Sequence, residues 1–255
     1  METVLEAKRL NKIYELGEGN RNHILKDIDI SINKGEFVAV MGASGSGKST
    51  FLYNVSGMDE LTSGSVMLEQ EDLCRLCQQA LARLRLNHMG FVFQQNHLLK
   101  TLCILDNIML PSVLAKKGSR KQIRERALRL MEETGISHLA YRDISMASGG
   151  ELQRVSICRA LMNEPEILFA DEPTGALNAR SSEEIMDLLA RINRQGTTIL
   201  LVTHDAKVAA KTQRVLWMRD GRIESEKMLG QVETEGGDVR AREIALTAWL
   251  SEMGF

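Results

Sequence analysis

The sequence predicts an α/β fold that combines a parallel sheet, antiparallel strands near the N-terminus and an inserted helical subdomain. Two continuous apolar runs, residues 37–42 and 197–205, are typical of strands covered on both faces. A short strand at residues 166–172 and a helical pattern at residues 180–196 precede the second run, which is the βαβ arrangement of a parallel sheet. Between residues 98 and 159 the apolar periodicity is helical instead.

The N-terminal third is predicted to be mostly strand. Residues 4–10 and 24–32 alternate apolar and polar side chains, as strands with one solvated face do. The buried strand that follows leads through a glycine-rich loop into a short helix at residues 49–58. Two further strands are expected between turn signals, at residues 64–70 and 90–94.

Helices and one hairpin are expected farther along the chain. The helical insertion contains three segments with an apolar stripe, at residues 104–117, 120–135 and 151–162. After the last buried strand, residues 214–225 form the pattern of a hairpin with Asp-Gly at its turn.

The C-terminal part is predicted to be a linker followed by a helix. From Lys227 the chain is polar and contains several glycines, and residues 241–255 then have an amphipathic pattern. Its apolar side consists of Leu246, Trp249, Leu250 and Met253. We therefore expect one domain at residues 1–225, with its insertion at about residues 98–159, and a linker and helix at residues 226–255.

The composition is that of an ordinary globular protein, and the net charge argues against two classes of partner. The net charge of -2 over 255 residues gives no basic footprint for nucleic acid or anionic lipid. The first ten residues lack the pattern of a secretory signal, and the apolar runs are shorter than a bilayer-spanning helix requires. We expect a cytosolic chain that meets a membrane only through a partner.

Four cysteines fit a reducing compartment, and two of them, Cys74 and Cys77, form a C-x-x-C pair. A zinc or redox site is the alternative interpretation, but no second pair stands at ligand spacing. The segment around them, residues 73–86, has helical apolar spacing. We interpret both as ordinary helix cysteines, and we expect surface or packing roles for His88, His97 and His138.

The segment GASGSGKST, Gly42 to Thr50, follows a buried strand and opens a helix, the context in which G-x-x-x-x-G-K-[ST] binds nucleoside triphosphates. Its backbone N–H groups can surround phosphate oxygens, while Lys48 supplies a charge and the Ser49 hydroxyl can ligate Mg²⁺. A glycine-rich turn without a ligand is the alternative. The motif completes the fold class as a P-loop NTPase core, with these contacts to ATP or GTP: Gly42, Ser44, Gly45, Gly47, Lys48, Ser49 and Thr50.

Two acids end the strand at residues 166–172, where a parallel sheet presents its carboxyl edge to a ligand. There Asp171 is expected to hold Mg²⁺, and Glu172 to orient or deprotonate the attacking water as general base. An acidic turn before Pro173 is the alternative.

Two more polar residues follow strands of the same predicted sheet. His204 comes just after an apolar strand, where an imidazole can hydrogen-bond the γ-phosphate, although a lone histidine is more often structural. Gln94 ends another strand, and its amide is suited to holding water or Mg²⁺ at the entrance to the helical insertion. We place both with Glu172 in the catalytic set.

The segment ASGGELQR, residues 147–154, looks like a second phosphate-binding helix start in one chain. The order of the phosphate loop, GFVFQ, ASGGELQR, ILFADEPTGALN and THD resembles the nucleotide-binding subunit of ATP-binding-cassette (ABC) transporters over about residues 4–224. The resemblance implies that Ser148, Gly149 and Gly150 contact the ATP bound to a second copy. It thereby implies a homodimer holding two ATP, attached through an integral membrane permease to the cytoplasmic face of the membrane.

Single positions carry further implications of this resemblance. Tyr14 corresponds to the aromatic residue that stacks on adenine, with an ordinary strand-end tyrosine as the alternative. The signature departs from Leu-Ser-Gly-Gly-Gln, since Ala147 precedes the serine and Glu151 follows the glycines. Asn178 stands where the family usually has aspartate, which bears on the coupling between the two sites.

Longer runs, such as SGMDELTSGSV and FADEPTGALN, resemble the branch of macrolide and peptide exporters, lipoprotein-release and cell-division ATPases, and bacitracin-type resistance systems. Among these, the chain is most similar to the antimicrobial-peptide resistance ATPases. A regulatory ATPase that signals through its membrane partner without transport is the main alternative. A cassette acting on DNA or ribosomes fits poorly, because the chain has one cassette and a negative net charge.

One apolar stretch is a candidate for the permease contact. Three leucines follow Gln94, namely Leu98, Leu99 and Leu102. This stretch is too apolar for an exposed loop that has no binding partner. Burial in the core of the helical insertion is the alternative.

Overall fold

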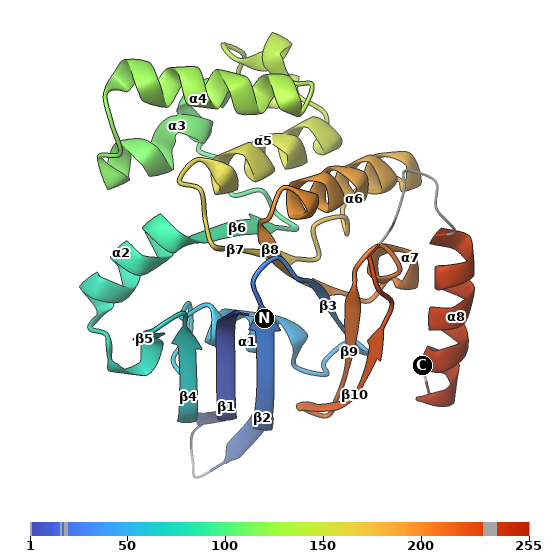
Figure 1. Cartoon of the computed structure of the whole chain (residues 1–255). Helices are drawn as coiled ribbons and strands as arrows, with labels where there is room; N and C mark the ends of the chain where they lie inside the picture. Colours follow the sequence, from blue (N-terminus) through green and yellow to red (C-terminus); the bar gives the residue numbers. More distant parts are fainter. Residues whose placement is uncertain (1, 16, 18–19, 232–238, 255) are drawn as a thin grey trace.

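The computed structural model of the chain describes residues 2–15, 17, 20–231 and 239–254. Two sheets lie beneath a group of helices (Figure 1). The predicted α/β fold with a parallel sheet, antiparallel N-terminal strands and a helical insertion is confirmed.

The larger sheet has six strands in the order β10-β9-β3-β8-β7-β6. Its strands β3, β6, β7, β8 and β9 are mutually parallel, and β10 pairs antiparallel with β9. The bounds are β3 (Phe37–Met41), β6 (Met89–Phe93), β7 (Ile167–Asp171), β8 (Thr198–Thr203), β9 (Arg214–Arg219) and β10 (Arg222–Met228). The hairpin β9–β10 turns at Asp220 and Gly221, both with positive φ (48° and 80°), as the Asp-Gly pair predicted.

The smaller sheet is antiparallel, in the order β2-β1-β4-β5. Its strands are β1 (Thr3–Glu15), β2 (Arg21–Asn33), β4 (Ser63–Leu68) and β5 (Glu71–Asp72). β1 and β2 are longer than the alternating patterns predicted, because their pairing continues through register shifts toward residues 15 and 21. The prediction missed β5, which is only two residues long.

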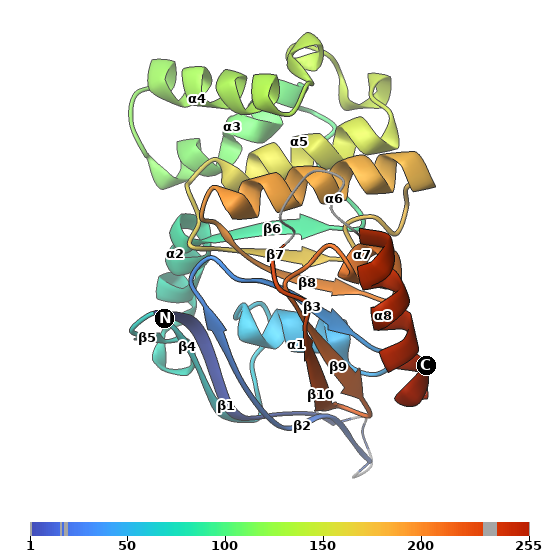
Figure 2. The same ribbon diagram turned by 45° about the vertical axis from the view of Figure 1, so that its right-hand side comes forward.

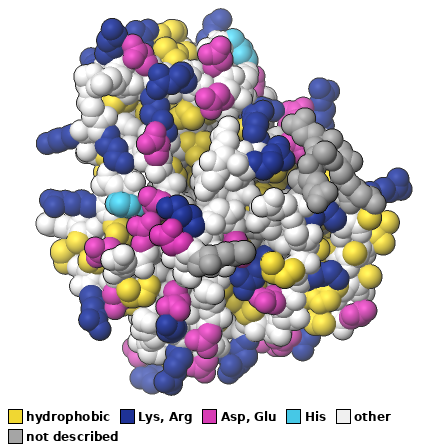
Figure 3. Space-filling model, viewed as in Figure 1, with side chains coloured by type: hydrophobic (Ala, Val, Ile, Leu, Met, Phe, Trp, Pro, Cys, Tyr) yellow, Lys and Arg dark blue, Asp and Glu magenta, His cyan; other side chains and the backbone are white. Residues whose placement is uncertain are grey.

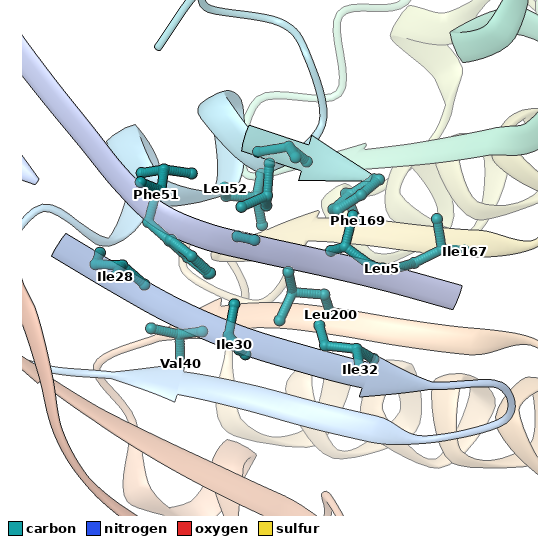
Figure 4. Packing of buried hydrophobic residues seen from close by; sticks show 14 of the residues in the cluster. Leu5, Ile28, Ile30, Ile32, Val40, Phe51, Leu52, Ile167, Phe169 and Leu200 are labelled. Carbon is teal, nitrogen blue, oxygen red and sulfur yellow. The ribbon is translucent and has the colours of Figure 1, made fainter. Parts of the chain in front are cut away.

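Helix α1 (Lys48–Val55) packs between the two sheets and belongs to a first hydrophobic core (Figure 4). Phe51 and Leu52 of this helix meet the inward side chains of β1 and β2 there. The fully buried strand β3 divides its side chains by the two-residue period of a strand. Val38 and Val40 enter this core, while the alternate residues enter a second core on the other face of the sheet.

The remaining helices of the described chain are α2 (Gln78–His88), α3 (Ile104–Ala115), α4 (Arg120–Glu133), α5 (Gly149–Leu161), α6 (Ala179–Arg194), α7 (Ala206–Ala209) and α8 (Val239–Glu252). Helices α5, α6, α7 and α8 cover the opposite face of the large sheet (Figure 2), while α2 packs against the first core and α3 and α4 pack with α5. Short 3₁₀ turns lie at Leu73–Arg75, Ser137–Leu139 and Ile144–Met146. α3, α4 and α5 share a third core, which corresponds to the predicted insertion, and α5 also packs Ile157 into the second core.

Helix α8 docks on the main body rather than standing apart. Leu246 and Leu250 are buried in the second core, and Trp249 and Met253 pack against it, as the amphipathic pattern predicted. The guanidinium of Arg242 donates to the carbonyls of Ala210, Leu229, Thr212 and Gly230 at 2.6–3.1 Å. Of the predicted linker, which begins at residue 226, residues 226–228 lie in β10, and residues 232–238 fall outside the described part of the chain.

The described surface carries charges of both signs. On the face shown in Figure 3, Lys and Arg side chains alternate with Asp and Glu side chains. Every helix in the described ranges is too short or too polar to cross a lipid bilayer.

Candidate functional site

The glycine-rich loop connects β3 to α1, and its backbone requires glycine at several positions. Gly45 and Gly47 have φ of 81° and 102°, a region that side chains disfavour. A Cβ at Gly42 would lie 2.2 Å from the carbonyl oxygen of Met218, so no side chain fits there. These constraints keep the loop compact ahead of the N-terminus of α1, where backbone N–H groups favour an anion.

An open cleft of about 890 Å³ brings the loop together with the ends of two strands. Glu172 follows β7 and His204 follows β8, and these neighbouring parallel strands present both residues at one edge of the sheet. The cleft is lined by Ile24, Ala43, Ser44, Gly45, Gly47, Lys48, Ser49, Thr50, Glu172 and His204. A volume of this size can accommodate a nucleotide.

Lys48 is 8% exposed and lies at the floor of the loop. Its ammonium group donates to the carbonyl oxygens of Gly42 and Ala43, both at 2.8 Å. Burial lowers the pKa of Lys48, while the negative charges of Glu172 and Asp171 oppose that shift. An anion in the cleft would therefore meet a partly desolvated cation, whose attraction is less screened than in water.

Asp171 ends β7 and is bound by two hydroxyl groups from one face of α1. The Ser49 hydroxyl donates to Oδ1 at 3.0 Å, and the Tyr53 hydroxyl donates to Oδ2 at 2.8 Å. Residues four apart on a helix share a face, which explains why both reach the same carboxylate. Burial and then Asp171 raise the pKa of Tyr53 to about 12, so its hydroxyl stays protonated and donates.

The pair Ser49–Asp171 fits a magnesium ion. Both side chains offer hard oxygen atoms, which are the ligands that Mg²⁺ prefers, and the two oxygens are already 3.0 Å apart. Within the described ranges no group of three or more His, Cys, Asp or Glu side chains is placed to hold a metal. A cation held by these two residues would need further oxygen atoms to complete its shell.

Glu172 and His204 form a direct pair. His204 Nδ1 lies 2.8 Å from Glu172 Oε1, and the carboxylate is the more buried partner, with 19% of its side chain exposed against 66% for the imidazole. Glu172 has φ of 47°, a strained conformation for a residue with a side chain and one concentrated at functional sites. Its N–H donates to the Val202 carbonyl at 3.0 Å, which holds it beside β8.

Gln94 and Tyr14 lie outside the lining of this cleft. Gln94 follows β6 and is exposed. Its Nε2 lies close to Gly175, because a Cβ added at Gly175 would be 2.9 Å from this atom. The Tyr14 hydroxyl donates to Asp59 Oδ2 at 2.6 Å, and the ammonium of Lys12 lies 4.6 Å from the ring centroid. Burial, followed by Asp59, raises the pKa of Tyr14 to about 12.

The Ser-Gly-Gly segment starts α5 but does not line the cleft of its own chain. Ser148 is the N-cap, and it forms a capping box in which Glu151 Oε2 accepts from the Ser148 N–H and Oγ at 2.8 and 2.7 Å. A Cβ added at Gly149 would lie 3.5 Å from Leu177, an ordinary contact distance. A Cβ added at Gly150 would lie 3.2 Å from Ser181 Oγ, which is tighter. This helix start is therefore well formed, and it lies apart from the residues that line the cleft of its own chain.

The other residues singled out from the sequence lie at a helix cap, beside a helix or on the surface. Asn178 is the N-cap of α6 and accepts from the Ser181 N–H at 2.9 Å. Cys74 lies in a 3₁₀ turn and Cys77 immediately precedes α2, so the predicted single helix is interrupted between them, and both thiols are free. His88, His97 and His138 are exposed, as predicted.

The sequence is similar to known proteins over most of its length. The family model described as ABC transporter matches residues 25–175. The macrolide export ATP-binding/permease protein MacB of Aggregatibacter actinomycetemcomitans is 42% identical over 231 residues, covering 91% of this chain and 36% of that protein. MacB of Hahella chejuensis is 43% identical over 253 residues, covering 98% of this chain and 38% of its own.

Solved structures with a similar fold are known as well. A structure described as the dimer of MJ0796, a bacterial ABC transporter cassette, superposes with a TM-score of 0.82 at 38% identity, covering 88% of this chain and 98% of that one. The same cassette in a post-hydrolysis state bound to ADP and Pi matches equally well, with a TM-score of 0.82. The chain spans somewhat more than a third of the length of the two MacB proteins, which contain a permease as well by name.

Proposed function

Since the chain belongs to the ABC transporter family and is an ATPase cassette of that family, we propose that it hydrolyses Mg²⁺–ATP in the cleft between the glycine-rich loop and the ends of β7 and β8. The observation that carries this site assignment is the convergence of Lys48, Ser49 and the Glu172–His204 pair on one cleft. As a domain, residues 1–225 form the cassette, and α8 is an addition docked on it.

Each side chain at the cleft has its own role in the proposed reaction. The backbone of residues 42–50 and Lys48 bind the phosphates, and Ser49 and Asp171 would hold a metal ion. When bound, Mg²⁺ neutralises charge on the phosphate oxygens. Glu172 orients and deprotonates the attacking water, His204 binds the γ-phosphate, and Gln94 holds water or the metal. Tyr14 stacks on adenine.

Replacing Lys48 tests the nucleotide site itself. Lys48→Ala removes the buried cation, and we expect the affinity for ATP to fall at least about tenfold, which corresponds to about 1.4 kcal/mol. Isothermal titration of the full chain with ATP measures this, and thermal melting checks that the loop still folds. Lys8→Ala, at a surface lysine paired with Glu6, serves as the matched control. Unchanged ATP affinity in Lys48→Ala would remove the loop from the binding site.

We further propose that the active form is a homodimer with two ATP at its interface. The Ser-Gly-Gly helix start has a complete cap and no role in its own cleft, and a second copy offers the phosphate that it fits. The MJ0796 cassette, which resembles this chain over most of its length, is itself described as dimeric. Each ATP would then lie between one chain's Lys48 and the other's Ser148.

For the membrane partner, we propose a permease that docks at the loop after Gln94 and brings the cassette to the cytoplasmic face of the membrane. Leu98 packs against the third core, so the core interpretation applies to it. Leu99 remains 46% exposed, although Asn107 fixes its backbone through bonds of 2.7 and 3.0 Å. An exposed leucine with a fixed backbone, five residues after Gln94 in the sequence, is suited to a contact that responds to nucleotide.

Leu99→Asp is expected to leave folding and ATP binding intact and to prevent copurification with the permease, because a carboxylate in an apolar contact costs several kcal/mol. Affinity purification from cells that produce both proteins measures this. Ile244→Asp, at a more exposed position on α8 (65% against 46% for Leu99), is the control and should copurify normally. A folded Leu99→Asp chain that still copurifies would place the docking surface elsewhere.

The transport class that we propose is removal of antimicrobial peptides or export of macrolide-like compounds. The export function in the names of the MacB relatives and the FADEPTGALN run of the chain support it. Deleting the gene should raise sensitivity to such compounds, and a Glu172→Gln gene should fail to restore resistance. Resistance restored by the inactive variant would favour the signalling function instead.

A further inference from the structure

The two oxygens of Asp171 have different partners. Ser49, which binds Oδ1, lines the nucleotide cleft, whereas Tyr53, which binds Oδ2, is not among the residues lining it. The phenol is half-buried and packs against the first core between the sheets. Of the two bonds, the one from Tyr53 is therefore the one that a ligand in the cleft need not displace.

A carboxylate at the end of a strand can turn about its last bond and exchange its two oxygens. A hydroxyl donor at 2.8 Å from one oxygen selects a single orientation, and the rigid tyrosine ring loses little conformational freedom in making the bond. The remaining oxygen, Oδ1, is then directed toward Ser49, which lines the cleft. Partners behind a metal ligand commonly set its orientation and basicity in this way.

We propose that Tyr53 is a positioning residue for the metal site, which holds Asp171 so that one oxygen always faces the cation bound with ATP. This inference rests on the proposed function, because it concerns the same cleft. It assigns a role to a residue outside the glycine-rich loop and outside the acidic strand end. The sequence signal is the four-residue spacing between Ser49 and Tyr53 on α1.

The test compares nucleotide binding with and without the metal. The full chain carries Glu172→Gln to prevent turnover, and binding of the fluorescent analogue mant-ATP is titrated in EDTA and again in excess Mg²⁺. The ratio of the two dissociation constants measures what the metal adds. For Tyr53→Phe, which keeps the ring, we expect an unchanged constant in EDTA and a metal-dependent gain about tenfold smaller.

Tyr141→Phe is the matched control, because it removes a tyrosine hydroxyl that is hydrogen-bonded to Arg124 on the exposed surface of the helical insertion. It should keep the full metal-dependent gain. A full gain in Tyr53→Phe would overturn the assignment, as would an equal loss of binding in EDTA and in Mg²⁺, which would mean that Tyr53 only supports the loop. Absence of any Mg²⁺-dependent gain in the parent chain would overturn the proposed metal site and this assignment with it.

Discussion

Glu172→Gln should reduce ATP hydrolysis by at least about 100-fold while ATP binding stays within about twofold of the parent chain. The amide has the shape of the carboxylate and can still bond His204, which lies 2.8 Å from the carboxylate oxygen. It cannot accept the proton of the attacking water. ATP should therefore accumulate uncleaved, and the dimer that it holds together should persist.

The measurement combines a steady-state phosphate-release assay with size-exclusion chromatography in ATP. Glu164→Gln, at an exposed glutamate paired with Arg126, is the control for a lost surface charge. Rapid hydrolysis by Glu172→Gln would place the general base on another residue. Loss of ATP binding would instead make Glu172 part of the binding site.

Gly149→Asp is expected to abolish ATP-driven dimerisation and to lower turnover by at least about 100-fold, while each monomer still binds ATP. The position tolerates a side chain within its own chain, since the nearest atom to a new Cβ is 3.5 Å away. An acidic residue in the first turn of α5 also suits the helix dipole, so the fold should survive. In the dimer, however, the added carboxylate would face an anionic phosphate in a poorly screened site.

Gly149→Asn separates charge from size, because it adds the same number of heavy atoms without the charge. It should impair dimerisation much less than Gly149→Asp. Sedimentation velocity with ATP, in the Glu172→Gln background, measures the fraction of dimer for both variants. Equal defects in the two would attribute the effect to steric hindrance, and dimerisation of Gly149→Asp at the parent level would remove Gly149 from the interface.

The sequence predicted the fold well where a segment carries its own pattern. The buried run of β3, the Asp-Gly hairpin and the apolar side of α8 each depend on neighbours in sequence. β5 and the extensions of β1 and β2 depend on pairing with a partner strand, which leaves little mark on the strand itself.

The same distinction explains what was missed at the site. The glycine-rich loop and the acids after β7 have local signatures, but the bond between Tyr53 and Asp171 joins residues far apart in the sequence. The resting contacts of Lys48 with Gly42 and Ala43, and of Tyr14 with Asp59, are likewise set by the fold. Asn178 also caps helix α6, a local role that its correspondence to the family's usual aspartate does not indicate.

The central claim is that each active site contains Lys48 from one chain and Ser148 to Gly150 from another. A mixed dimer tests it most directly, with one subunit carrying Gly149→Asp and the other unsubstituted, distinguished by size tags. After vanadate trapping, an azido-ATP photolabel marks the subunit whose glycine-rich loop holds the nucleotide. The account predicts label on the Gly149→Asp subunit and loss of label from its unsubstituted partner. Loss of label from the Gly149→Asp subunit instead would contradict it, because the signature would then act within its own chain.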